Sequence, residues 1–121
     1  MSIAGLAGFL STVRQDKDRW RLVAEFLEEY HHEPADTKHA LLQETPHPTG
    51  EEHWDVFLAA LAEHLSAAEG TAGPAWTHGR TLRSFWFPFD TPAARADALV
   101  HAPAAFRRRG ILVAPQELAV R

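Results

Sequence analysis

The chain has 121 residues and contains no cysteine, which excludes disulfide bonds, thiolate metal sites and cysteine nucleophiles. Hydrophobic residues make up 45% of the sequence and charged residues 23%, a composition typical of a globular rather than a disordered protein. No uncharged apolar run approaches the ~18 residues that a membrane helix requires. We therefore expect one domain, residues 1–121, in a cytoplasmic protein.

The net charge of −4 conceals a difference between the two parts of the sequence. Residues 1–70 contain five Lys/Arg against thirteen Asp/Glu, a net charge of −8. Residues 71–121 contain seven Arg against three Asp/Glu, a net charge of +4. Two surfaces of opposite sign favour contacts with different neighbours, or a head-to-tail attraction between copies. Ordinary solvated faces would produce the same distribution.

Helical periodicity dominates the N-terminal half. A first helix is predicted to begin near Ser2 as its N-cap. Its apolar stripe consists of Ile3, Leu6, Leu10 and Val13. The charged run 16–18 interrupts this pattern and offers a cap for a second helix. The stripe of that helix consists of Trp20, Val23, Leu27 and Tyr30, widened by Leu22 and Phe26. Pro34 then ends the second helix and suits the first turn of a short third helix that runs to Thr45.

The clearest helix follows the stiff connector 46–48. Thr49 and Glu52 have the spacing of a capping box, in which Thr49 caps the helix and Glu52 bonds back to it. The inward stripe consists of Trp54, Leu58, Leu61 and Leu65, supported by Phe57. The loop 70–74, which begins with Gly70 and ends with Gly73 and Pro74, is a natural stop for this helix.

The last third of the chain shows weaker periodicity. Aromatic residues alternate along 85–89 as in an extended segment, but no second strand candidate is long enough to pair with it, so we expect an irregular segment packed over the helices. Thr91 and Pro92 predict the start of a fifth helix, and a short sixth helix is predicted to end at Gly110. An extended tail, 111–113, and a last turn follow. The prediction is an all-α fold: a compact bundle of five to six short helices with an irregular aromatic segment and an extended C-terminal tail.

No catalytic signature occurs in the sequence. The eight histidines form no HExxH or His-x-His pair, the serines lie in no GxSxG context, and no Gly-rich phosphate loop is present. His53 and His64 share a helix face but lie about 16 Å apart along the axis, too far for one metal ion. We therefore expect no catalytic residue, no metal ligand and no cofactor. A metal-dependent helical hydrolase with scattered histidine ligands is the alternative.

Binding features are more pronounced. The three arginines 107–109 fall at the C-terminal end of the short sixth helix, where positive charge is favourable. Because consecutive helical residues point about 100° apart, the three cannot share one face. We expect Arg108 to lie over the surroundings of Phe106, which leaves the other two free for a phosphate or a carboxylate. The candidate partner-binding residues are Arg80, Arg83, Phe85, Trp86, Arg107, Arg108 and Arg109. An accessory protein that binds nucleic acid through arginine is a further alternative.

Four separated blocks of the sequence are similar to a known group of proteins. The blocks are 49–55 (TGEEHWD), 61–65 (LAEHL), 85–87 (FWF) and 102–110 (APAAFRRRG). Together they resemble the C-terminal region of actinobacterial helix-turn-helix, antitoxin-type regulators that are encoded beside nucleotidyltransferase-like toxins. The likeness extends over most of the chain from Trp20 onward.

The resemblance implies a protein partner. Proteins of that group carry an N-terminal helix-turn-helix, whereas only residues 1–19 precede Trp20 here. We therefore expect contact with a partner protein, such as a nucleotidyltransferase-like toxin, rather than direct DNA reading. A homodimer and a weaker contact with nucleic acid are further expectations, and no membrane contact is expected.

Overall fold

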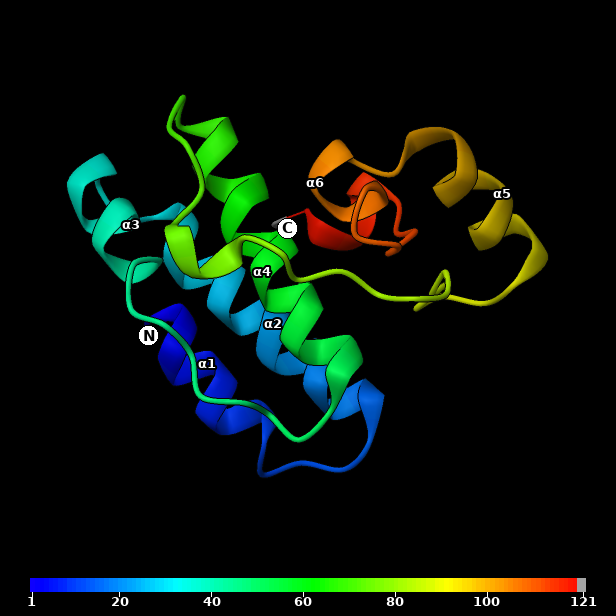
Figure 1. Ribbon diagram of the computed structural model, residues 1–121, viewed down its shortest axis with the longest axis horizontal. Helices are drawn as coiled ribbons and strands as arrows, with labels where there is room; N and C mark the ends of the chain where they lie inside the picture. Colours follow the sequence, from blue (N-terminus) through cyan, green and yellow to red (C-terminus); the bar gives the residue numbers. More distant parts are fainter. Residues whose placement is uncertain (120–121) are drawn as a thin grey trace.

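Figure 1 shows the computed structural model, which describes residues 1–119. The α-helices are α1 (Ile3–Leu10), α2 (Asp16–His31), α3 (Ala35–Leu41), α4 (Glu52–Ala68), α5 (Pro92–His101) and α6 (Ala104–Arg107). Two 3₁₀ turns, η1 (Ala75–Thr77) and η2 (Pro115–Leu118), complete the described elements. The predicted all-α fold of short helices is confirmed.

Helix α4 forms the centre of the molecule, and α1, α6 and η1 all pack against it. Its residues 56–62 are all buried, so the helix is enclosed on every side at its middle. A helix that is apolar all round suits such a position, because it has no face left for solvent. The predicted stripe is confirmed as buried: Trp54, Phe57, Leu58, Leu61 and Leu65.

Helix α1 closes one side of this core. Ser2 caps it as predicted, because its Oγ accepts a hydrogen bond from Gly5 N at 3.0 Å. The helix ends at Leu10, so the prediction that Val13 continues its stripe is wrong. The hydroxyl groups of residues 11–12 bond back to carbonyls of the last turn, which favours an end at this point.

Helix α2 is joined to α4 through aromatic contacts. Trp20 packs edge-on against Trp54 with ring centroids 5.1 Å apart, and its ring lies 4.9 Å from that of Phe89. The prediction that the run 16–18 caps this helix is wrong, since no side-chain cap bond is present and Asp16 is already its first residue. The Asp16 carboxylate instead accepts a hydrogen bond from Trp54 Nε1 at 3.1 Å, which ties the start of α2 to α4.

The predicted capping box at the start of α4 is also wrong. The N-cap residue is Glu51, and it makes no side-chain cap bond. Thr49 bonds to Asp55 instead: its N and its Oγ1 lie 2.8 Å and 2.9 Å from Asp55 Oδ1. One carboxylate in the first turn therefore holds the connector and also places negative charge at the helix N-terminus, where it is favourable.

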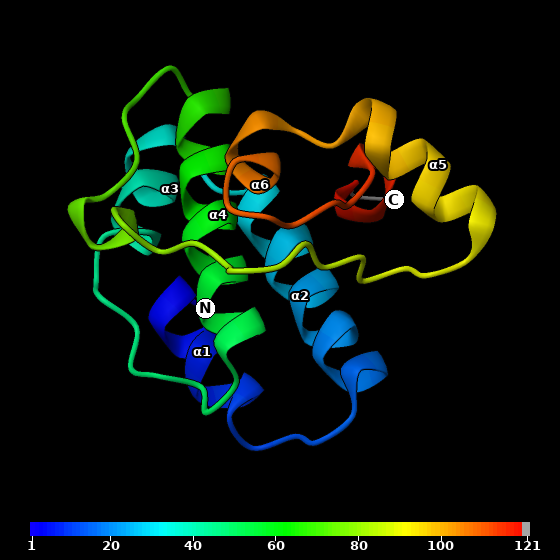
Figure 2. The same ribbon diagram turned by 45° about the vertical axis from the view of Figure 1, so that its right-hand side comes forward.

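The C-terminal part forms a smaller lobe beside the bundle (Figure 2). Thr91 caps α5 as predicted, accepting a hydrogen bond from Ala94 N at 3.2 Å. A separate small cluster of Ala98, Ala102 and Leu112, with Phe87 against it, attaches α5 to the rest of the chain. Helix α5 consequently projects away from α1 and α3 in both ribbon views.

Residues 111–113 are buried, which confirms the predicted extended tail on the core. Contrary to expectation, this tail pairs with the aromatic segment: Trp86 and Ile111 form an isolated parallel β-bridge. As expected, the segment forms no full strand within residues 1–119. The absence of a long partner strand still allows a bridge of one residue pair.

In residues 1–119 no helix combines the length and the apolar character that a membrane crossing demands.

Candidate functional site

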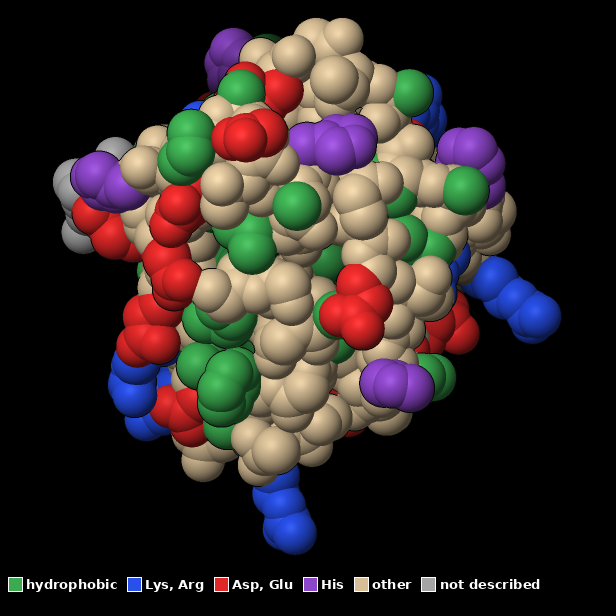
Figure 3. Space-filling model, turned by 90° about the vertical axis from the view of Figure 1, so that its left-hand side faces the viewer, with side chains coloured by type: hydrophobic (Ala, Val, Ile, Leu, Met, Phe, Trp, Pro, Cys, Tyr) green, Lys and Arg blue, Asp and Glu red, His purple; other side chains and the backbone are tan. Residues whose placement is uncertain are grey.

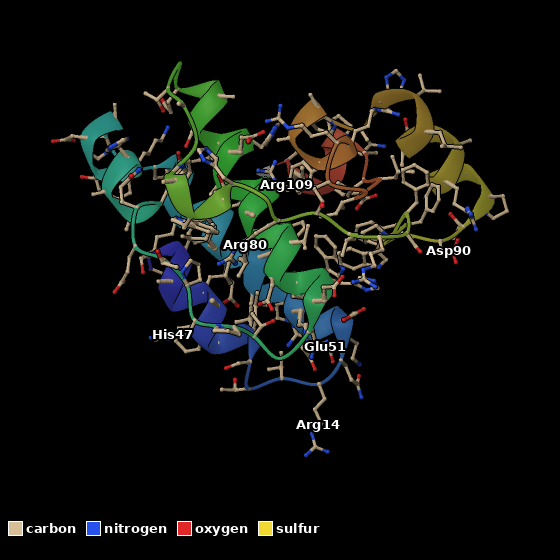
Figure 4. All side chains as sticks on the ribbon, in the orientation of Figure 1. Arg14, His47, Glu51, Arg80, Asp90 and Arg109 are labelled. Carbon is tan, nitrogen blue, oxygen red and sulfur yellow. The ribbon has the colours of Figure 1, made fainter. Side chains whose placement is uncertain are left out.

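Arg109, one of the predicted partner-binding residues, is buried. Only 5% of the residue is exposed. Its Nη1 donates to Ala105 O at 3.0 Å, and its Nη2 donates to Glu63 Oε2 at 3.0 Å and to Thr77 O at 3.2 Å. Figure 4 shows Arg109 between α4 and α6. The expectation that Arg109 is free for a ligand is therefore wrong: it joins α6, α4 and η1.

The other two arginines of the run are engaged at the surface. Arg108 forms an ion pair with Glu63, so it reaches α4 instead of covering Phe106, as we expected. Arg107 Nη2 donates to Leu99 O at 2.8 Å, at the C-terminal end of α5. Free carbonyls there attract positive charge. Arg107 and Arg108 thus hold α5 and α4 next to α6, although both residues are exposed.

Arg80 lies in the loop that follows η1. It is half-buried, and its guanidinium carbon lies 5.2 Å from the ring centroid of Trp76. Figure 4 labels both Arg80 and Arg109, which come from different segments of the chain. Because Arg109 is buried, the predicted arginines do not all belong to one surface patch.

The aromatic segment around Trp86 is held firmly by the tail. Leu82 N donates to the Arg109 carbonyl at 2.9 Å, Trp86 N to the Gly110 carbonyl at 2.8 Å, and Leu112 N to the Trp86 carbonyl at 2.9 Å. These three bonds fix the backbone on both sides of residues 83–85.

Side-chain contacts hold Trp86 from a second direction. Its ring stacks on His53 of α4, with centroids 4.7 Å apart and an interplanar angle of 13°. The ring also packs edge-on against Trp54, with centroids 5.5 Å apart. Trp86 is half-buried in this position, so its main role in the fold is to anchor the segment.

Arg83 and Phe85 remain exposed between these anchors. Phe85 is 72% exposed, the highest value among the large hydrophobic residues of the described chain. Arg83 is exposed and forms no ion pair with any described residue. We call this pair the Arg83–Phe85 edge. Of the seven predicted residues, these two are both exposed and free of internal partners in residues 1–119.

A second surface was not predicted as a site: the outer side of α2. Glu25, Glu28 and Glu29 of α2, together with Glu33 just beyond its end, are referred to below as the acidic face. They line an open depression of about 590 Å³ together with Arg21, Ala24 and His32. Figure 3 shows acidic side chains in a column along one side of the molecule. The sequence signal for this surface is the helical spacing of its glutamates, which a solvated helix face shows equally well.

Two histidines lie on a separate groove of about 330 Å³ between α2, α4 and η2. Burial lowers the pKa of His64, and the charge of His31 lowers it further. Burial also lowers the pKa of His31, with Lys38 as the next cause. Within residues 1–119 no group of three His, Cys, Asp or Glu side chains is placed to hold a metal ion. The hydrolase alternative therefore has no ligand cluster in that part of the chain.

Comparison with known proteins finds no matching family model, no matching curated protein and no matching solved structure. The resemblance to antitoxin-type regulators stays a prediction.

Proposed function

We propose that the protein is a non-catalytic interaction domain of antitoxin type, which binds and neutralises a partner protein through the Arg83–Phe85 edge. The observation that carries this proposal is the exposure of Phe85 on a segment whose backbone is fixed on both sides. Covering an exposed aromatic ring with a partner removes it from water and lowers the free energy of the system. Aromatic residues and arginine are also the types that contribute most to protein interfaces.

The rigidity of the edge supports the same function. A loop that is already ordered loses little conformational entropy on binding, so more of the contact energy appears as affinity. The bonds from Leu82 and Trp86 to the tail, and the stacking of Trp86 on His53, supply that order. A mobile loop with the same two exposed residues would bind more weakly.

We expect the partner's surface to have an apolar pocket next to a carboxylate. Phe85 would enter the pocket, and the Arg83 guanidinium would bond to the carboxylate in a charge-assisted pair. The resemblance of four sequence blocks to antitoxin-type regulators supports a nucleotidyltransferase-like toxin as this partner. The product of the adjacent gene in the native host is the candidate to test.

The test is a growth assay combined with purification of the complex. The neighbouring gene product is expressed alone and together with this protein, and we expect arrested growth alone and normal growth together. Nuclease treatment during purification should leave the complex intact, because nucleic acid does not bridge it. Phe85→Ala should weaken binding about thirtyfold, which corresponds to about 2 kcal/mol.

Phe9→Ala is the matched control, since Phe9 is also a large exposed aromatic residue but lies on α1. It should leave growth rescue and affinity unchanged. A neighbouring product that is harmless alone and forms no complex would overturn the proposal. A complex that disappears on nuclease treatment would favour the nucleic-acid alternative instead.

A further inference from the structure

We infer that the protein also associates with itself head to tail, with the Arg83–Phe85 edge of one copy seated in the acidic face of a second copy. This inference shares one surface with the proposed function but does not depend on a toxin partner. It assigns a role to the acidic face, which the proposed function leaves unused.

The acidic face has the shape and chemistry of a receptor for an aromatic side chain flanked by positive charge. Its depression of about 590 Å³ is wide open to solvent, and its lining contains Ala24, Arg21 and His32 besides the four glutamates. Long charged side chains commonly offer their stems to apolar partners in this way. The space is ample for one phenylalanine ring.

The charges around the depression are only partly compensated. Arg21 is the one Lys or Arg in its lining, and its Nη2 lies 3.6 Å from Asp18 Oδ1, outside the acidic face. Glu29 pairs with the N-terminal amine, and Glu28 Oε1 lies 3.8 Å from His32 Nδ1. Glu25 and Glu33 form no ion pair with any residue that the structure describes. The face therefore keeps free negative charge for an incoming cation.

The opposite surface supplies both groups that this receptor requires. Phe85 is the large exposed ring, and Arg83, two residues before it, has no acidic partner among residues 1–119. Seating the ring over Ala24 would place the guanidinium among the glutamates. One contact would then bury the exposed phenylalanine and neutralise an unpaired arginine.

The two surfaces lie on different sides of the same molecule. In Figure 1 the segment that carries the edge passes in front of α4, whereas α2 passes behind it. The acidic column in Figure 3 runs along the side that is turned away from the viewer in Figure 1. One copy cannot join its own two surfaces, so the contact is heterologous and each added copy leaves one free surface at either end.

The association should be weak, in the range of about 10–1,000 μM, because one loop in one open depression buries less than the ~1,200 Å² of a standard interface. Sedimentation of the full chain over this concentration range should show a mass that rises with concentration. Added salt should lower the mass, since screening shortens the reach of exposed charges to about 3 Å at 1 M.

Two variants test the head-to-tail geometry. The edge variant carries Arg83→Glu and Phe85→Ala, and the face variant carries Glu25→Lys and Glu28→Lys. Each should be monomeric alone. An equimolar mixture should form a dimer and stop there, because the face variant keeps its edge and the edge variant keeps its face.

The control variant carries Glu44→Lys and Glu51→Lys, the same charge change at exposed positions outside α2. It should associate like the unmodified protein, and circular dichroism should show equal helix content in all variants. A wild-type protein that stays monomeric up to ~1 mM would overturn the inference, and so would a mixture that fails to form the dimer. The face variant should still rescue growth, so failure here and failure of the proposed function are distinguishable.

Discussion

Arg109 and Glu63 form an ion pair across 46 positions of sequence, with Nη2 and Oε2 3.0 Å apart at the junction of α4 and α6. The Glu63 carboxylate holds Arg108 as well, so one acidic side chain fixes two of the three consecutive arginines. Arg109 is nearly inaccessible to solvent, and its remaining bonds go to the Ala105 and Thr77 carbonyls. The basic run is thus mainly a connector within the fold.

We expect Glu63→Ala to lower the free energy of unfolding by about 2–4 kcal/mol. The substitution leaves a buried guanidinium without its counter-ion, which is the costly way to break a buried pair. Arg108→Ala should cost less than about 1 kcal/mol, because that side chain is 63% exposed. Urea unfolding of both variants measures the difference. Equal losses would contradict the distinction between the two arginines.

Gly110 gives a second test of how the tail meets the aromatic segment. Its φ is +86°, and an added Cβ would lie 3.4 Å from the Leu82 Cβ. Gly110→Ala should therefore destabilise the protein by about 1–2 kcal/mol, because an L-residue pays a steric cost in this region. Gly8→Ala is the matched control: Gly8 lies in α1, nothing is within 4 Å of the added Cβ, and we expect a gain of about 0.5–1 kcal/mol. A neutral Gly110→Ala would show that the segment adjusts freely there.

Local sequence patterns predicted the parts of the fold that depend on neighbours in sequence. The buried stripe of α4, the Ser2 cap of α1 and the Thr91 cap of α5 all follow from spacings of three or four residues. The predicted capping box does not form because two carboxylates are within reach of the Thr49 backbone N–H. This group donates to Asp55, six residues away, and not to the predicted Glu52.

The candidate site depended on contacts that sequence spacing does not report. Three consecutive arginines look equivalent in sequence, and Glu63 pairs with two of them. Arg109 differs because it is buried and also donates to the Ala105 and Thr77 carbonyls. The alternation of aromatic residues was visible, but which of them face outward depends on the bridge between Trp86 and Ile111. Phe85 is exposed because its neighbour Trp86 occupies the contact with α4.

Stability should fall in mild acid because of His64. Burial lowers its pKa below the ordinary value of 6.5, so the unfolded chain binds a proton at pH values where the folded protein does not. The contribution of His64 is fully present above pH 6.5 and is lost as the pH falls from there through its lowered folded value. Chemical unfolding of His64→Gln between pH 7.5 and 5 should show a weaker loss than the unmodified protein.

His32→Gln serves as the control for this pH series, because the side chain of His32 is 72% exposed. It should keep the acid loss of the unmodified protein. A loss that is the same in all three proteins would assign it to other groups, such as His31 or the carboxylates, and not to His64.

Tyr30 should titrate far above the usual range of a phenol. It is only 2% exposed, and burial, with the charge of Glu69 as the smaller cause, raises its pKa from 10.0 to about 12. The sequence contains one tyrosine, so the phenolate absorbance of the whole protein reports this side chain alone. In the folded protein the absorbance should rise near pH 12, and in denaturant near pH 10.

The same shift predicts a loss of stability in alkali. Above pH 10 the unfolded chain releases the phenolic proton while the folded protein retains it, so the contribution of Tyr30 is lost as the pH rises from 10 to about 12. Tyr30→Phe should remove that part of the loss. At pH 7 the substitution should be neutral or stabilising, because the Tyr30 hydroxyl is buried and has no hydrogen-bond partner within residues 1–119. A Tyr30→Phe variant destabilised by more than about 1 kcal/mol at pH 7 would show that the hydroxyl has a partner in solution, such as an ordered water.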